Sequence, residues 1–112
     1  MRSSAASDVY KRQVGGLKPE GTYIDLAVAL AIYSTYRGMA APARTIVIGE
    51  IGLTGELRTV QNADKIVREA VRMGFKQIIM PVKNAERIKP AGEMKIIGVK
   101  NIQEAIRVFR NC

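Results

Sequence analysis

The side chains that most often carry out catalysis are scarce in this sequence. It contains no histidine, and its one cysteine, Cys112, is the last residue. Without histidine, a Ser-His-Asp triad, a Cys-His pair and most zinc sites are excluded. A single cysteine cannot form an internal disulfide, so nothing indicates an oxidising compartment. We expect no metal site in this chain.

Three glycines recur at every third residue in one segment, at Gly49, Gly52 and Gly55. They follow a β-branched run but do not open a helix. No glycine is followed directly by lysine, so the phosphate-binding pattern G-x-x-x-x-G-K-[ST] is absent. The spacing favours turn geometry and close packing, and we expect no ATP site within this chain.

Acidic residues flank this segment, and another stands near the start of a predicted helix. Glu50 and Glu56 lie on either side of the glycines, and Asp25 lies in the helical region. A carboxylate in a buried helix must be paired, capped or functional. Asp25 therefore has two interpretations. It is either a functional acid or a first-turn residue that the helix dipole favours and that accepts bonds from backbone N–H groups.

Six basic residues are spaced through positions 65–87 of the chain: Lys65, Arg68, Arg72, Lys76, Lys83 and Arg87. The first three lie at positions i, i+3 and i+7 of a predicted helix, so they share one face. The opposite face is apolar and should be buried: Ile66, Val67, Ala70 and Met73. If the sheet brings the six together, they form a DNA-binding surface that contacts phosphates rather than bases. The alternative is a solvated helix face, partly neutralised by Glu69.

The composition is that of one ordinary globular domain. The chain has 112 residues, of which 47% are hydrophobic and 25% charged, and its net charge is +8. This charge favours acidic partners, either nucleic acid or an anionic membrane surface. The longest apolar run, 26–33, is far shorter than the roughly 20 residues that cross a bilayer. Aromatic residues make up only 5% and tryptophan is absent, which disfavours binding of single strands by base stacking.

Apolar periodicity and turn residues predict the elements that must position these side chains. We expect helices over 22–37, 62–73 and from 102 to about 109, a short helix or turn over 83–88, and strands over 45–49, 57–60, 76–80 and 95–99. The first helix is apolar nearly all round and should be buried. Asn62 and Asn101 are expected N-caps, and Gly38 should end the first helix. The order of elements predicts an α/β (α+β) two-layer sandwich with a mixed sheet.

The first thirteen residues, MRSSAASDVYKRQ, have no helical or strand period. They also lack the apolar core of a secretory signal. The string SSAASDVYKRQ resembles translated sequencing-adapter scars. We therefore expect residues 1–13 to be disordered and artefactual, and residues 14–112 to form the domain.

The glycine segment also carries a family resemblance. Residues 48–58 read IGEIGLTGELR, which resembles the signature of the Lon-protease-like C-terminal domain of the RadA (Sms) family of bacterial DNA repair proteins. Four further strings match the same domain in order and spacing: VGGLK at 14–18, DLAVALA at 25–31, Glu69-Ala70 and Gly74-Phe75-Lys76. The resemblance covers residues 14–110, and it departs from the family at Thr59, where proline is usual.

Active Lon proteases share this fold and cut peptides with a Ser–Lys dyad, in which serine attacks and a neutral lysine takes its proton. Aligned through the glycine segment without gaps, the serine position falls on Tyr23 and the lysine position on Asp64. A phenol and a carboxylate cannot perform these two steps. Lys65 is adjacent, but one helical residue turns it about 100° away. We therefore expect no catalytic residue, as in the RadA copy of the domain, which is regarded as non-proteolytic.

The resemblance implies a longer parent protein with an N-terminal zinc finger and a RecA-like core that is a DNA-dependent ATPase. Such a protein forms a hexameric ring in the bacterial cytoplasm and processes branched or single-strand-containing recombination intermediates with a recombinase partner. ATP, Mg and Zn are implied for those upstream domains, and no cofactor is implied for this fragment. The fragment would be a scaffold and DNA-backbone-binding module that does not act on membranes.

Two other interpretations remain open. One is a Lon-family ATP-dependent serine peptidase domain, against which Tyr23 and Asp64 argue. The other is a stand-alone α/β module with no role on DNA, whose basic residues form a solvated face.

Overall fold

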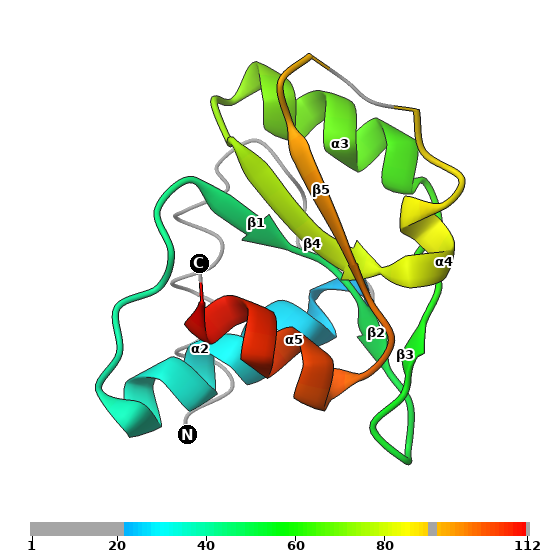
Figure 1. Cartoon of the computed structure of the whole chain (residues 1–112). Helices are drawn as coiled ribbons and strands as arrows, with labels where there is room; N and C mark the ends of the chain where they lie inside the picture. The colour runs from blue at the N-terminus through cyan, green and yellow to red at the C-terminus, as the bar shows by residue number, and fades with distance from the viewer. Residues whose placement is uncertain (1–21, 90–91, 112) are drawn as a thin grey trace.

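A three-stranded parallel sheet forms the centre of the molecule (Figure 1). The computed structural model describes residues 22–89 and 92–111. The strands are β1 (Thr45–Val47), β4 (Gln77–Pro81) and β5 (Lys95–Val99), and β4 lies between the other two. The register places Ile46 beside Ile78 and Ile78 beside Ile96. Isoleucine in all three strands is typical of a parallel sheet whose two faces are both covered.

A small antiparallel hairpin follows β1, made of β2 (Glu50–Ile51) and β3 (Leu57–Arg58). The predicted return strand at 57–60 is therefore confirmed in part. The described residues do not form the single mixed sheet that the sequence predicted. The parallel strands and the antiparallel strands belong to two separate sheets. The division falls at Gly49. Ile48 N still donates to Ile79 O at 2.9 Å, but Gly49 N turns to Tyr23 O at 2.8 Å, so the chain leaves β4 there.

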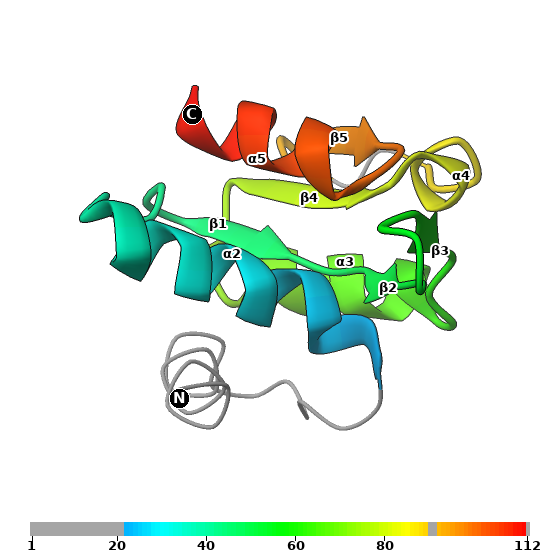
Figure 2. The same ribbon diagram turned by 90° about the horizontal axis from the view of Figure 1, so that it is seen from below.

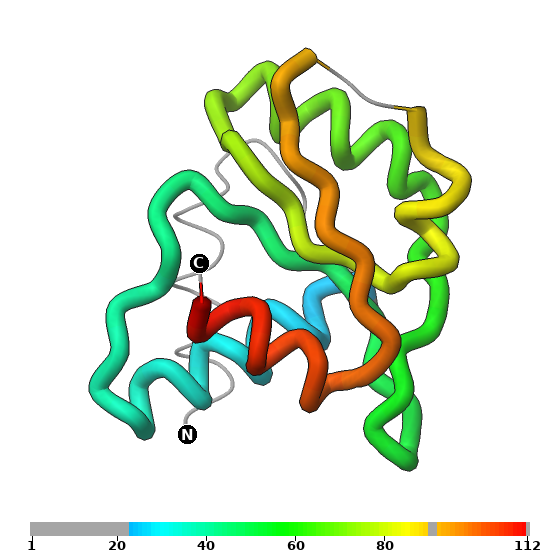
Figure 3. The backbone as a smooth tube through the Cα atoms, viewed as in Figure 1, coloured from blue at the N-terminus to red at the C-terminus, as the bar shows by residue number. Residues whose placement is uncertain are grey.

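Helices cover both faces of the parallel sheet, so the described part of the chain has three layers rather than the expected two (Figures 1 and 2). The helices are η1 (Thr22–Ile24), α2 (Asp25–Arg37), α3 (Ala63–Arg72), α4 (Val82–Ala85) and α5 (Ile102–Arg110). One face of the sheet is covered by α2 and α5. Of these, α2 lies beside β1 and α5 lies beside β5, and the two helices contact each other. The other face packs against α3 and α4. Both parallel connections cross over on this second face (Figure 3).

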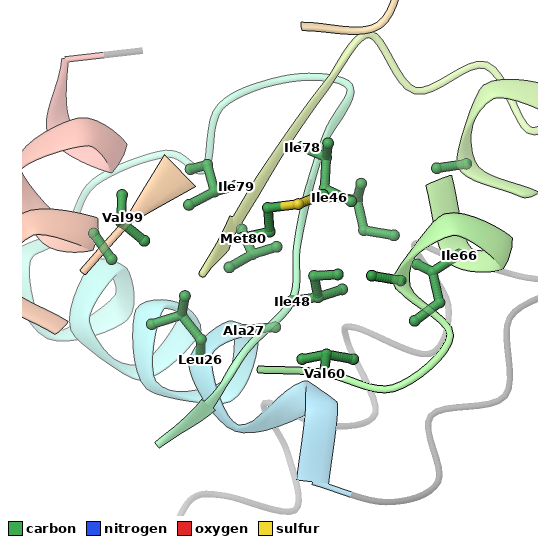
Figure 4. Close-up of a cluster of buried hydrophobic side chains, with 14 of the residues drawn as sticks. Leu26, Ala27, Ile46, Ile48, Val60, Ile66, Ile78, Ile79, Met80 and Val99 are labelled. Carbon is green, nitrogen blue, oxygen red and sulfur yellow. The ribbon is translucent and has the colours of Figure 1, made fainter. Parts of the chain in front are cut away.

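Three consecutive residues of β4 show why two layers are not enough. Ile78, Ile79 and Met80 all have 0% of their surface exposed. Successive side chains of a strand point to opposite faces, so both faces of β4 must be covered. In Figure 4, Ile78 lies on the side of Ile66 from α3, whereas Ile79 lies on the other side.

The helix ends agree with the sequence at two positions and differ at one. Gly38 ends α2 in the left-handed region with φ 67°, and Asn101 caps α5 by accepting a hydrogen bond from Glu104 N at 2.8 Å. Asn62 occupies the N-cap position of α3, but its side chain makes no capping bond. Its backbone is left-handed, with φ 60°, rather than in the extended conformation that a capping side chain requires.

The expectation that the first helix is buried all round is wrong for the described residues. Leu26, Ala27 and Leu30 are buried, but Ile32 is 43% exposed and Tyr36 is 86% exposed. One side of α2 packs on β1 and α5, and its other side carries these two exposed residues.

Element boundaries elsewhere follow the sequence closely. The predicted strand at 95–99 coincides with β5, and the predicted helix at 62–73 exceeds α3 by one residue at each end. The short helix or turn expected at 83–88 is the helix α4, which begins one residue earlier and ends at Ala85. Residues 1–13 lie outside the described residues. Within the described residues, no helix is long and apolar enough to cross a membrane.

Gly98→Ala should lower the free energy of unfolding by about 1–3 kcal/mol, the range of overpacked core positions. A Cβ at Gly98 would lie 3.0 Å from Val82 Cα and 3.1 Å from Ala85 Cβ, and the first of these is backbone that cannot swing aside. Urea unfolding measures the loss. A Gly98→Ala variant as stable as the parent chain would contradict the close packing of α4 on β5.

Candidate nucleic-acid interface

The glycine segment is a tight hairpin turn. Gly52 N donates to Glu56 O at 2.8 Å, and Gly55 N donates to Gly52 O at 3.1 Å. A Cβ built on Gly52 would lie 2.0 Å from Glu56 Oε2, so the carboxylate occupies the space that any larger residue would need. The interpretation of these glycines as turn and packing residues is therefore confirmed at Gly52 and Gly55.

The two acidic residues of the hairpin are held by neighbours on the hairpin itself. Glu56 accepts hydrogen bonds from the hydroxyl and the backbone N–H of Thr54, and these bonds, the hydroxyl first, lower the pKa of its carboxyl. Arg58 lies 3.7 Å from both Glu50 and Glu56. An arginine that pairs with two carboxylates favours a structural ion-pair role for them over general acid catalysis.

Asp25 joins α2 to the hairpin. It is the first residue of α2, and its Oδ2 accepts a hydrogen bond from Ile51 N at 3.1 Å. This agrees with the interpretation of Asp25 as a first-turn residue that binds backbone N–H. The sequence did not indicate that the donor would come from β2, 26 positions further along.

The two positions aligned with the Lon dyad lie in different elements. Tyr23 belongs to η1, is half-buried, and accepts a hydrogen bond from Gly49 N through its backbone oxygen. Asp64 lies in the first turn of α3, is exposed, and accepts from Arg68 Nη1 at 3.4 Å.

The basic face of α3 is solvent-exposed, as expected. Lys65, Arg68 and Arg72 are exposed. The opposite face was expected to be buried. Ile66, Val67 and Ala70 are buried, and Met73 is half-buried.

Two of these three cations already have acidic partners on the same helix. Arg68 lies 3.4 Å from Asp64, and Arg72 lies 2.6 Å from Glu69. The hydrogen bond from Arg72 lowers the pKa of Glu69, and the same bond raises the pKa of Arg72. The α3 face is therefore more neutralised than the sequence suggested, because Asp64 contributes as well as Glu69.

The remaining three predicted residues lie at the two ends of α3, and all three are exposed. Lys76 stands between α3 and β4, at the C-terminal end of the helix. Lys83 lies in α4 and Arg87 just after it, and α4 is held beside the chain that enters α3. The link is Asn84, whose amide accepts from Val60 N at 2.8 Å and donates to Val60 O at 3.0 Å.

The structure thus distributes the six residues along α3 instead of gathering them into one cluster. A helix of ten residues is about 15 Å long. Lys83 and Arg87 lie at its N-terminal end, the three helical cations lie along it, and Lys76 lies at its C-terminal end (Figure 1).

Two further exposed cations adjoin Lys76, and neither was among the six predicted residues. Arg44 directly precedes β1, and Lys95 is the first residue of β5. Lys76 N donates to Arg44 O at 2.8 Å, and Lys95 N donates to Lys76 O at 3.0 Å. The signal was present, because strands were expected to begin at 45, 76 and 95. Aligning their starts brings the three backbones together, but the register pairs Gln77 with both Thr45 and Lys95, so Lys95 points to the opposite face of the sheet from Lys76.

Metal ligands are not gathered in the part of the chain that the structure describes. No group of three or more His, Cys, Asp or Glu residues there is placed to hold a metal ion.

Known proteins resemble this chain over most of its length. A family model described as "Subunit ChlI of Mg-chelatase" matches residues 13–84. The DNA repair protein RadA of Halalkalibacterium halodurans is 40% identical over 101 residues, which are 90% of this chain and 22% of that protein. RadA of Escherichia coli is 40% identical over 105 residues, 94% of this chain and 23% of that protein. RadA of Bacillus subtilis is 41% identical over 101 residues, 89% of this chain and 22% of that protein.

The chain spans about a fifth of the length of these curated relatives, and the ChlI model covers well over half of the chain. The hairpin and α3 described above both lie within the matched residues. The chain therefore belongs to the family described as subunit ChlI of Mg-chelatase, and it is a homologue of the bacterial DNA repair protein RadA in its Lon-like C-terminal region.

Proposed function

We propose that this chain is a DNA-backbone-binding and scaffolding domain of a RadA-type DNA repair protein. The observation that carries the proposal is the identity of about 40% to proteins named DNA repair protein RadA over about nine tenths of the chain. The exposed cations along α3 support it, because a row of lysines and arginines is the electrostatic footprint of a phosphate-binding surface.

The chemistry of this surface favours the backbone of DNA over its bases. Arginine and lysine at the surface of α3 and α4 reach phosphates without entering a groove. For a single domain, we expect a dissociation constant of about 10⁻⁴ to 10⁻⁶ M at physiological salt, with little dependence on sequence.

Fluorescence anisotropy with two unrelated duplexes of equal length tests this. The two dissociation constants should agree within about threefold, because phosphate contacts carry no sequence information. A tenfold or larger preference for one duplex would contradict backbone binding.

Arg68→Ala with Arg72→Ala should weaken binding to both duplexes equally. The double variant should reduce the slope of log K against log salt by up to about 1.8, or about 0.9 for each lost phosphate contact. The ion pairs with Asp64 and Glu69 make this an upper bound. The control is Asn111→Ala, which removes no charge. An unchanged slope in a folded double variant would remove the α3 face from the DNA surface.

The longer protein to which this domain would belong is part of the same proposal. We propose a parent with a zinc finger and an ATPase core that binds ATP, Mg and Zn and forms a hexameric ring. It would act on branched or single-strand-containing DNA with a recombinase. A ring would present several copies of the weak surface to one DNA molecule, and multivalency would then raise the overall affinity.

The domain itself should have no peptidase activity. A Ser–Lys mechanism needs a nucleophilic hydroxyl and a neutral amine in hydrogen-bond reach, and Tyr23 and Asp64 supply neither. Unfolded casein and fluorogenic peptides, with and without ATP, should stay intact, as in a mock preparation. Cleavage above the mock level that Tyr23→Phe or Asp64→Asn abolishes would replace the scaffold proposal with the peptidase alternative.

A further inference from the structure

The parallel sheet ends on one side at β5, which has no strand beyond it among the described residues (Figure 2). Alternate residues of a parallel strand bond to the same neighbour. Lys95 N donates to Lys76 O at 3.0 Å, so Lys95 and every second residue after it bond to β4. The N–H and C=O groups of Ile96 and Gly98 therefore point outward, away from β4. We call these four backbone groups the open edge.

The side chains of β5 show the same missing neighbour. Ile78 and Ile79 of the central strand β4 are 0% exposed, whereas their register partners Ile96 and Ile97 are only half-buried. Helices cover both faces of the sheet, so the exposed part of Ile96 and Ile97 lies on the outer side of β5. A further strand would cover both side chains while it bonded to the open edge.

The interior of β5 lacks the features that usually protect a sheet edge from other chains. Residues 96–99 include no charged residue and no proline, and their one-to-one register with β4 contains no bulge. A strand of this kind is a template for pairing with another extended segment. The open edge is therefore a docking position for a strand.

The charge around the open edge decides which strand fits. Lys95 begins β5 and Lys100 follows its last residue, and both are exposed. The salt bridges found among the described residues involve neither lysine. Glu104 lies near Lys100, but its carboxylate accepts from the backbone N of Lys100 at 2.8 Å. A second copy of β5 fits poorly, because pairing in either direction brings lysines of the two copies together.

We infer that the open edge binds an extended acidic peptide segment of a partner protein, which adds a fourth strand to the parallel sheet. Backbone hydrogen bonds to Ile96 and Gly98 hold the segment. Its carboxylates, five positions apart like Lys95 and Lys100, lie opposite these two lysines. The inference goes beyond the proposed function, since it concerns a protein partner and a different side of the domain from α3.

Three peptides test the inference on the full chain by fluorescence anisotropy. The probe is fluorescein-labelled EVTVTE, whose glutamates have the required spacing and whose interior residues favour a strand. The comparison peptides are KVTVTK, which reverses the charge, and EVTVTE with N-methyl groups on both threonines, which pair with Ile96 and Gly98 in the antiparallel arrangement. EVTVTE should bind at least about tenfold more tightly than either comparison peptide. Equal binding of the three peptides, or no binding of EVTVTE, would overturn the inference.

Two variants at one position locate the peptide at the open edge. Ile96→Pro removes the outward N–H, and Ile96→Ala is the matched control, because it removes the same side chain and keeps the N–H. Ile96→Pro should bind EVTVTE at least about tenfold more weakly than Ile96→Ala. Equal affinities would place the peptide elsewhere and overturn the inference. Thermal unfolding checks that both variants fold, and the N-methylated peptide decides the question if Ile96→Pro does not.

Lys95→Gln should weaken binding of EVTVTE by about two- to fivefold, and high salt should remove this difference. Arg37→Gln is the control, because it makes the same charge change at the end of α2. Equal effects of the two variants would mean that net charge alone attracts the peptide, which contradicts the inference.

Sedimentation equilibrium without peptide tests the other occupant. The wild type should be monomeric. A dimer that persists in Ile96→Ala and is lost in Ile96→Pro would assign the open edge to a second copy and overturn the acidic partner. None of these measurements contains DNA, so their failure leaves the proposed function standing, and a failure of DNA binding leaves the inference standing.

Discussion

Ile78→Ala and Ile79→Ala should each lower the free energy of unfolding by about 2–5 kcal/mol, the range of isoleucine truncations in protein cores. Both side chains are 0% exposed, although they are consecutive in β4 and point to opposite faces of the sheet. Each truncation removes buried methyl groups and leaves a cavity, on the α3 side for Ile78 and on the α2–α5 side for Ile79.

This pair distinguishes a three-layer from a two-layer domain. In a two-layer sandwich one of the two side chains would face solvent, and its truncation would change stability by about 0.5 kcal/mol or less. Ile78→Val and Ile79→Val are the matched conservative variants, with expected losses of about 0.5–1.5 kcal/mol. Denaturant unfolding, with an m-value that stays the same, measures the free energy of unfolding of all four variants. A large loss at one position and none at the other would contradict helices on both faces.

Asn84→Ala should lower the free energy of unfolding by about 2–4 kcal/mol. Asn84 is 8% exposed, and its amide satisfies both the N–H and the carbonyl of Val60. Removing the amide leaves two backbone groups without a partner, and each unsatisfied buried group is worth about 1–3 kcal/mol. Because the same bonds hold α4 beside the entry to α3, the variant should also weaken DNA binding through displacement of Lys83 and Arg87.

Asn111→Ala is the matched control, because Asn111 is exposed and its one side-chain bond, to Arg107 O, is at a helix end. We expect a loss of about 0.5 kcal/mol or less there. Asn84→Asp keeps the acceptor for Val60 N but places a second acceptor against Val60 O, so it should destabilise as well. An Asn84→Ala variant as stable as the control would mean that Val60 finds other partners and that Asn84 does not position α4.

Local structure could be predicted where one residue type decides the backbone. Gly38 ends α2, Asn101 caps α5 and the β-branched residues within 95–99 indicate β5, because each of these signals depends on neighbours in the sequence. Asn62 failed as a cap because its backbone is left-handed, and nothing in its sequence neighbourhood indicates this.

The number of layers could not be predicted, because it depends on which elements pack together. The 45–49 strand divides at Gly49, whose N–H bonds to Tyr23 rather than to β4, and this long-range bond has no sequence signature. The exposed side of α2 is a related case. Ile32 and Tyr36 are as apolar as their buried neighbours, so composition alone could not separate the two sides of the helix.

The candidate site shows the same limit. The face shared by Lys65, Arg68 and Arg72 followed from helical spacing alone and is exposed as expected. Arg44 and Lys95 are separated by 51 positions in the chain, and only the parallel register brings their backbones beside that of Lys76. Asn84 was not singled out, because an asparagine that bonds to a distant backbone looks like any other asparagine in the sequence.

The most direct test of the central proposal is the salt dependence of duplex DNA binding by the whole chain. Binding of phosphates by the six cations along α3 predicts a slope of log K against log salt between about −3.6 and −5.4, because each of four to six contacts releases about 0.9 counterion. Anisotropy between 50 and 200 mM salt measures it. A slope in this range would support a DNA-backbone-binding domain, whereas no binding at 50 mM salt, or binding that salt does not weaken, would contradict it.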